Sequence, residues 1–166
     1  MDALIAGQNS PATPPDPPRG NVQVKIDDKG RLKLPAPFVA YVQALGSQLV
    51  HVTSIDKRTV RVYPISVWRR FENELNSRDF NQEIAQRIWR IARHYGGDAV
   101  IDDQGRILIP GELRQDLKLK DAQVYLCPEK SGRFDLVTKQ DYDASLGDAL
   151  AHAPEDGKYA ESMQLP

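Results

Sequence analysis

Two acidic pairs are the residues best placed to do chemistry. The pairs are Asp27-Asp28 and Asp102-Asp103, and a single residue separates each of them from a following Gly-Arg pair. Paired carboxylates can hold a metal ion or share acid–base work. Their place just before Gly-Arg favours another interpretation, in which the Asp side chains cap a turn and orient the arginine. We therefore expect the first Asp of each pair to position the arginine that follows it.

Other patterns typical of catalysis are absent from the sequence. It has no G-x-x-x-x-G-K-[ST] phosphate loop and no G-x-G-x-x-G. Composition leaves a Ser-His-Asp assembly open, but no nucleophile-elbow pattern supports one. The scattered His51, His94 and His152 cannot complete a zinc site with the single Cys127 at any recognised spacing. The sequence predicts no enzyme, no cofactor, no metal site and no small-molecule substrate.

The acidic pairs belong to an internal repeat. Residues 26–35 match residues 101–110 at an offset of 75, sharing Ile-Asp-Asp, Gly-Arg and the final Pro. Apolar and polar residues alternate on both sides of Gly30, which predicts two half-buried strands joined by a tight turn. The proline suits the first turn of a short helix. Two further strands should follow each helix, at 49–54, 60–63, 124–127 and 134–137.

Two longer helices are expected between the repeats. The first carries Trp68, and the second runs from about Gln82 to Tyr95 and ends at Gly96-Gly97. Their tryptophans should serve as core or helix–helix contacts. Residues 1–18 hold five prolines among small polar residues, and the segment from about 147 onward has no periodicity. We expect a disordered arm at one end and a loose tail at the other.

The charges are unevenly distributed along the chain of 166 residues, although its formal net charge is only −1. Residues 19–95 hold 14 basic and 7 acidic residues, whereas residues 96–166 hold 8 basic and 14 acidic residues. This asymmetry suggests one surface for a polyanion, although the basic residues could also lie on solvated helix faces. No apolar run approaches the ~20 residues that cross a bilayer, and Met1–Ala6 lacks the features of a secretory signal. A lone cysteine suits a reducing cytosol, so we expect a cytoplasmic protein without a membrane partner.

The first repeat gathers basic residues on one face. Its apolar residues alternate inward, so the basic residues between them point outward. These residues are Lys25, Lys29, Arg31 and Lys33. Four bases on a small ribbon make a phosphate-binding surface, and a two-stranded ribbon fits the DNA major groove. The second repeat keeps Arg106 but has Gln104 and Leu108 in place of two lysines, so its outer face could instead pack against a neighbour.

The two copies resemble the SpoVT-AbrB DNA-binding element, and the whole arrangement resembles the MraZ family of bacterial transcriptional regulators. Further landmarks carry this resemblance: Arg19-Gly20 before the first motif, Tyr63-Pro64 before a tryptophan-bearing helix, and Leu113-Arg114 after the second motif. The resemblance covers about residues 19–143.

The resemblance implies an α+β fold. Two tandem AbrB-like swapped-hairpin β elements would form a pseudo-two-fold β core, with a helical pair inserted between them. The chain would then divide into a disordered Pro-rich arm (1–18), a first SpoVT-AbrB-like element (19–68), connecting helices (69–96), a second such element (97–143) and a flexible C-terminal tail (144–166).

The resemblance also implies a function and a site. The protein would be a sequence-specific regulator, typically a repressor, of the division and cell-wall gene cluster. It would assemble into a closed ring on short G-rich promoter repeats of double-stranded DNA, associated with the nucleoid. The contacts would fall on the Asp-x-x-x-Arg motifs, Asp27 with Arg31 and Asp102 with Arg106. We expect Arg31 to contact a base or phosphate, and Lys29 and Lys33 to contact phosphates.

Two other interpretations stay open. An antitoxin-like protein-interaction module of the same superfamily would join one such element to a partner-binding tail, and the two elements with a helical insertion argue against it. A scaffold that has lost DNA binding would explain the acidic second half, but the basic first ribbon argues against it.

Overall fold

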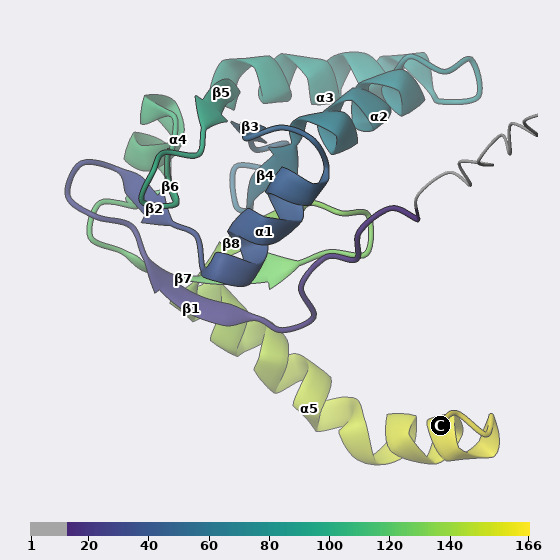
Figure 1. Ribbon diagram of the computed structural model, residues 1–166. Coiled ribbons are helices and arrows are strands. Elements are labelled where there is room, and N and C mark those ends of the chain that lie inside the picture. The colour runs from purple at the N-terminus through teal and green to yellow at the C-terminus, as the bar shows by residue number, and fades with distance from the viewer. Residues whose placement is uncertain (1–12) are drawn as a thin grey trace, which may run out of the picture.

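The computed structural model describes residues 13–166 as a mixed α+β fold (Figure 1). Its strands are β1 (Val22–Lys25), β2 (Arg31–Lys33), β3 (Leu49–Thr53), β4 (Val60–Pro64), β5 (Gly97–Val100), β6 (Arg106–Leu108), β7 (Gln123–Pro128) and β8 (Phe134–Thr138). Its helices are α1 (Ala36–Ala44), α2 (Ile65–Leu75), α3 (Gln82–Tyr95), α4 (Gly111–Asp116) and α5 (Lys139–Ser162). The α+β class and the strand, turn and helix sequence of each repeat are confirmed.

The strands exchange partners between the two repeats. The larger sheet has the order β1-β7-β8-β4-β3-β5, and β2 pairs with β6 in a separate two-stranded ribbon. Thus the first strand of each repeat pairs with the later strands of the other, and the strands after the two turns pair with each other. Every pair is antiparallel. The repeats are interlocked and share one body.

Hydrogen bonds outside the ladders follow the same exchange. The Leu34 N–H donates to the Gly105 carbonyl at 2.9 Å, and the Ile109 N–H donates to the Gly30 carbonyl at 2.9 Å. Leu34 and Ile109 are equivalent at the offset of 75, as are the two glycines. The two halves are therefore related by a local pseudo-two-fold arrangement, and each turn is tied to the strand end of the other repeat.

The core lies under the turns and the ribbon. The alternating residues Leu32, Leu34, Ile107 and Ile109 are all buried, as the sequence pattern predicts. They belong to one apolar cluster that draws side chains from both repeats, including Phe38 and Phe134 in edge-to-face contact. Burial of these inward residues is what forces the basic residues between them onto the outer face.

Helices α2 and α3 lie next to each other beside β3 and β4 (Figure 1). Trp68 is buried there with Tyr63, and its ring meets that of Trp89 edge-on at 6.0 Å. The prediction that both tryptophans make core or helix–helix contacts is confirmed. Across the part of the chain that the structure describes, no helix is long and apolar enough to span a membrane.

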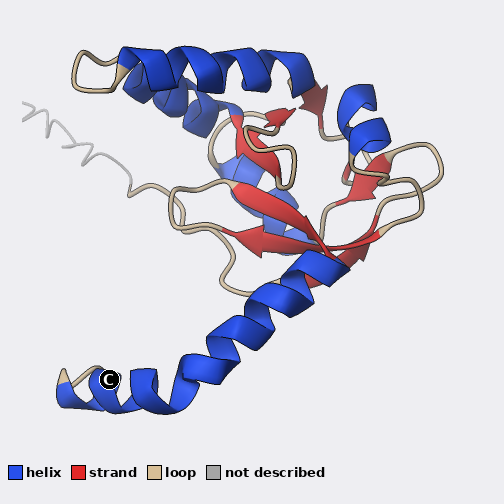
Figure 2. Ribbon diagram, turned by 180° about the vertical axis from the view of Figure 1, so that it is seen from behind, coloured by secondary structure: helices blue, strands red, loops and turns tan. Residues whose placement is uncertain are grey.

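The prediction of a loose C-terminal tail is wrong. Residues 139–162 form the helix α5, which leaves the sheet and buries none of its residues (Figure 2). The helix begins where the Thr138 hydroxyl accepts the Asp141 N–H at 3.2 Å. Its alanines favour helix without any packing pattern, which is why periodicity does not reveal it. Pro154 lies inside the helix, which bends near its far end, as expected where a backbone N–H is missing (Figure 1).

The Pro-rich arm is described only in part. Residues 13–18 contain no helix or strand, and the remainder of the predicted disordered segment lies outside the described residues.

Candidate nucleic-acid interface

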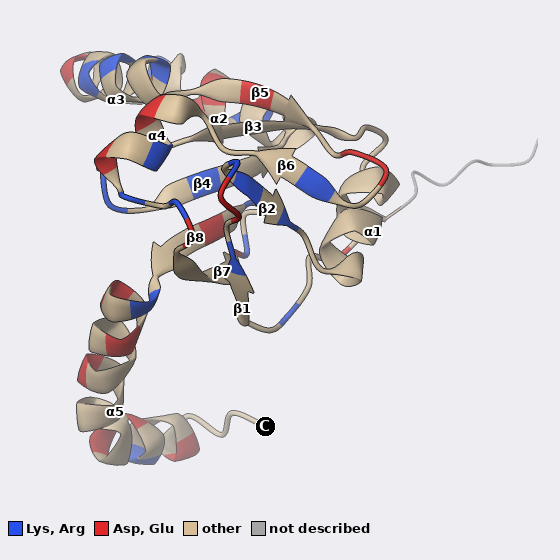
Figure 3. Ribbon diagram, turned by 90° about the vertical axis from the view of Figure 1, so that its left-hand side faces the viewer, with Lys and Arg blue, Asp and Glu red and all other residues tan. Residues whose placement is uncertain are grey.

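Basic residues stand on both strands of the ribbon made by β2 and β6 (Figure 3). Leu32 and Ile107 are opposite each other and buried, so their neighbours on both strands point the other way. On the outer face Arg31 lies opposite Leu108, and Lys33 lies opposite Arg106. The ribbon therefore shows three cations and one exposed leucine to solvent.

Asp27 clamps Arg31 within the first turn. Its Oδ1 accepts the backbone N–H of Lys29 at 2.9 Å and that of Arg31 at 2.8 Å. Its Oδ2 accepts the Nε–H of Arg31 at 2.9 Å. The turn is closed by the Gly30 N–H donating to the Asp27 carbonyl at 3.0 Å, with Gly30 at φ +79°. One carboxylate therefore shapes the turn and orients the guanidinium.

The second turn repeats this geometry. Asp102 Oδ1 accepts the backbone N–H groups of Gln104 and Arg106, both at 2.9 Å, and Oδ2 accepts the Arg106 Nε–H at 2.8 Å. Gly105 has φ +76°. The two Asp-x-x-x-Arg motifs are thus matching structural units. Asp27 and Asp102 have the expected orienting geometry, and turn capping accounts for the first acid of each pair.

Both orienting carboxylates have a lowered pKa. For Asp27 the largest cause is the hydrogen bond from the Arg31 backbone N–H, and for Asp102 it is the one from the Arg106 backbone N–H. Burial opposes these effects, and the guanidinium charges add to them. Each carboxylate is ionised at neutral pH. Within the described chain the terminal guanidinium nitrogens of Arg31 and Arg106 have no protein partner, so they are free to bind a ligand.

The lysines predicted for the interface are not all on the ribbon. Lys33 is exposed on its outer face, and Lys29 is exposed at the tip of the first turn. Lys25 is exposed too, but it ends β1 and lies opposite Gln123 in the larger sheet. The expected pairing of the two strands on either side of the first turn is wrong beyond a single bridge between Ile26 and Leu32. The basic ribbon is made by both repeats, since β2 pairs with β6.

Arg114 was not predicted as a site residue. It belongs to α4 of the second repeat, yet its Nη1 lies 3.4 Å from the Lys29 carbonyl of the first turn. The available signal was its place four residues after the repeated proline, a position that Val39 occupies in the first repeat. Among residues 13–166, no three His, Cys, Asp or Glu side chains gather as a metal site would require.

Comparison with known proteins places the chain in a family. A family model described as "MraZ protein, putative antitoxin-like" matches residues 19–91. A curated relative from Koribacter versatilis, named "Transcriptional regulator MraZ", is 38% identical over 103 residues, which are 61% of this chain and 70% of the relative. The chain belongs to the MraZ family.

Other MraZ relatives align over more of the chain. One from Desulfitobacterium hafniense (strain Y51) is 33% identical over 131 residues, 78% of this chain and 89% of the relative. One from Hydrogenovibrio crunogenus is 27% identical over 146 residues, 87% of this chain and 94% of the relative. Both carry the name "Transcriptional regulator MraZ". The MraZ likeness therefore reaches past the residues that the family model matches and includes the second repeat.

Proposed function

We propose that this MraZ protein is a sequence-specific DNA-binding transcriptional regulator, acting at the nucleoid in the cytoplasm. One observation carries the proposal: two identically clamped arginines, Arg31 and Arg106, on one exposed two-stranded ribbon. A ribbon of this size enters the major groove, where a guanidinium can donate two hydrogen bonds to the O6 and N7 atoms of guanine. Such contacts suit short G-rich promoter repeats.

The clamps support base reading because they remove freedom from the arginines. Each Nε–H is held by a carboxylate, so only the outer guanidinium edge is left for a partner. A side chain already fixed in its binding geometry loses little entropy when it meets a base. Lys29 and Lys33 beside Arg31 would supply the phosphate contacts that place the ribbon in the groove.

We further propose assembly into a ring that represses the division and cell-wall gene cluster. A single ribbon of two short strands offers few contacts, and linked copies on successive repeats would raise the affinity through effective concentration. Apolar side chains are available for contacts between copies. They are Ile84 and Ile91 on α3, and Leu146 and Leu150 on α5, all exposed.

DNA binding is tested with fluorescence anisotropy. The probe is duplex DNA from upstream of the protein's own gene, with a scrambled duplex as reference and a salt titration beside it. We expect selective binding that weakens steeply with salt. Arg31→Ala should abolish selectivity, while Arg87→Ala, which removes an exposed arginine of α3 away from the ribbon, should not. Equal affinity of wild type and Arg31→Ala would overturn the site assignment.

The ring is tested separately by light scattering coupled to size exclusion, and by binding to duplexes with one, two or three repeats. We expect one discrete multimer and an affinity that rises sharply with repeat number. A monomer, or an affinity independent of repeat number, would refute the ring.

A second candidate function, an antitoxin-like interaction module, is supported by the description of the matching family model. The exposed helix α5 would then be the partner-binding segment. Stoichiometric co-purification of a toxin-like neighbouring gene product, lost when the chain is truncated after Ser145, would favour this candidate.

A further inference from the structure

Different side chains pack against the two turns of the ribbon. A methyl group placed on Gly30 would overlap the Arg114 side chain, 2.6 Å from both Nε and Nη1. A methyl group on Gly105 would meet the Val39 Cγ2 atom at 3.4 Å. Val39 and Arg114 are equivalent, each four residues after the repeated proline. The pseudo-two-fold arrangement therefore places a guanidinium beneath the first turn and an apolar side chain beneath the second.

The Arg114 guanidinium is poorly satisfied by the protein. Its contact with the Lys29 carbonyl is long, at 3.4 Å. Its Nε is buried and has no hydrogen-bond partner among the described residues. A side chain that only braced a turn would be expected to pair its buried donors, because an unpaired one is costly. Val39 shows that an apolar side chain can occupy the same place.

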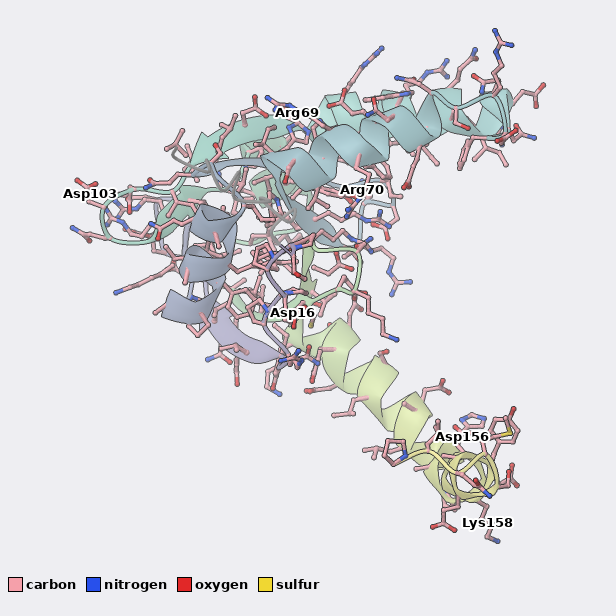
Figure 4. The ribbon with its side chains drawn as sticks, turned by 45° about the vertical axis from the view of Figure 1, so that its right-hand side comes forward. Asp16, Arg69, Arg70, Asp103, Asp156 and Lys158 are labelled. Atoms are coloured by element: carbon pink, nitrogen blue, oxygen red, sulfur yellow. The ribbon has the colours of Figure 1, made fainter. Side chains whose placement is uncertain are left out.

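This difference makes the two ends of the ribbon unequal in charge. The first turn gathers three cations: Lys29, Arg31 and Arg114. The matching positions of the second turn are Gln104, Arg106 and Val39, which leave one cation. Asp103 lies at the outer tip of the second turn and points away from the body (Figure 4), and Asp28 holds the matching position of the first turn, so these acids do not add to the difference. Because Lys33 lies opposite Arg106, the second end of the ribbon holds two cations, whereas the end at which Arg114 reaches the first turn holds three.

We propose that Arg114 is a phosphate contact of the DNA interface, supplied to the first turn by the second repeat. A phosphate oxygen would accept a charge-assisted hydrogen bond from the terminal guanidinium nitrogens, which the protein satisfies only through the long contact of Nη1 with the Lys29 carbonyl. Arg114 would then make the first turn the main backbone anchor, while the second turn contributes Arg106 alone. The inference rests on the proposed DNA-binding function.

The test counts phosphate contacts through the salt dependence of binding. Each contact adds about 0.9 to the slope of log affinity against log salt. Arg114→Val, which copies the side chain of the first repeat, should flatten the slope by about that amount and weaken binding about tenfold at low salt. Arg114→Lys should keep the slope, because the charge stays. Val39→Arg should steepen it, because a guanidinium is then placed under the second turn.

The possible outcomes distinguish a phosphate contact from a side chain that only supports the turn. If Arg114→Val melts earlier but keeps the wild-type slope, Arg114 only supports the turn and the proposal is wrong. If Arg114→Val does not fold, the proposal stands or falls on Val39→Arg, whose unchanged slope would overturn it. Arg87→Ala is the matched control for loss of an exposed arginine. Absence of DNA binding by the wild-type protein would instead refute the proposed function itself.

Discussion

Lys33 and Arg106 lie directly opposite each other on the outer face of the β2–β6 ribbon. Like charges in facing positions of an antiparallel pair destabilise it. The arginine is partly compensated by Asp102, but the lysine has no ion-pair partner within the described residues. The ribbon therefore keeps a positive outer face at a cost to its own stability, and a polyanion lying across both strands would remove that cost.

Replacing Lys33 by an acid should raise the stability of the protein and lower its affinity for DNA. Lys33→Glu places a carboxylate opposite Arg106, and we expect a gain of about 0.2–1 kcal/mol in the free energy of unfolding. The same change should weaken DNA binding, because a phosphate contact becomes a repulsion. Thermal denaturation and anisotropy measured on one preparation at low salt check both effects. A lower melting temperature, or unaltered DNA affinity, would contradict the assignment of this face.

Loss of the Asp27 clamp should weaken DNA binding even though Arg31 itself is not replaced. In Asp27→Asn the amide oxygen can still accept the two backbone N–H groups, but the amide nitrogen then faces the Arg31 Nε–H, donor against donor. We expect selective affinity to fall by at least about tenfold, since an unclamped guanidinium must be ordered on binding. Asp102→Asn is the matched change at the second turn. The idea that the clamps orient the arginines fails if neither variant loses affinity.

Acid should remove the contribution of the clamps to stability. Both carboxyls have a folded pKa below the ordinary value of 3.8, so their charged forms stabilise the folded state. That stabilisation is complete above this value and is lost as the pH falls through the folded pKa. We expect the wild-type urea midpoint to drop on acidification more than that of the double variant Asp27→Asn, Asp102→Asn. Parallel pH profiles for the two proteins would show that the clamps contribute nothing.

Alanine at either turn glycine should lower the stability, and the two variants should differ in DNA binding. Both glycines have positive φ, so alanine should cost about 1–2 kcal/mol at either position. Gly30→Ala must also displace Arg114, whereas Gly105→Ala meets Val39 and the Leu34 carbonyl at ordinary contact distances. Urea unfolding and the salt dependence of DNA binding are compared for the pair. We expect only Gly30→Ala to flatten the salt slope, and equal slopes would argue against the role of Arg114.

Local features of this chain could be predicted from the sequence because neighbours along the chain determine them. The alternation that buries Leu32 and Leu34 sets the outward direction of Arg31 and Lys33. The spacing of Asp27 and Arg31 places the clamp within one turn, and the bounds of α3 follow from its apolar pattern and the glycines after it.

Features that depend on distant partners could not be predicted in this way. The pairing of β1 with β7 joins residues about a hundred positions apart, so the ribbon assigned to the first repeat is in fact shared between both. The Arg114 contact with the first turn arises from the same exchange. Helix α5 was not predicted for another reason: none of its residues is fully buried, so no apolar pattern marks it.

The exchange of strands has a consequence for synthesis on the ribosome. β1 is made early, but its partner β7 begins only at Gln123, and β2 has no partner until β6 has emerged. The first repeat therefore cannot complete its sheet during most of translation, and its apolar strand edges stay open in the nascent chain. The shared sheet can close only after β7 and β8 have left the ribosome, so the fold forms late and as one unit.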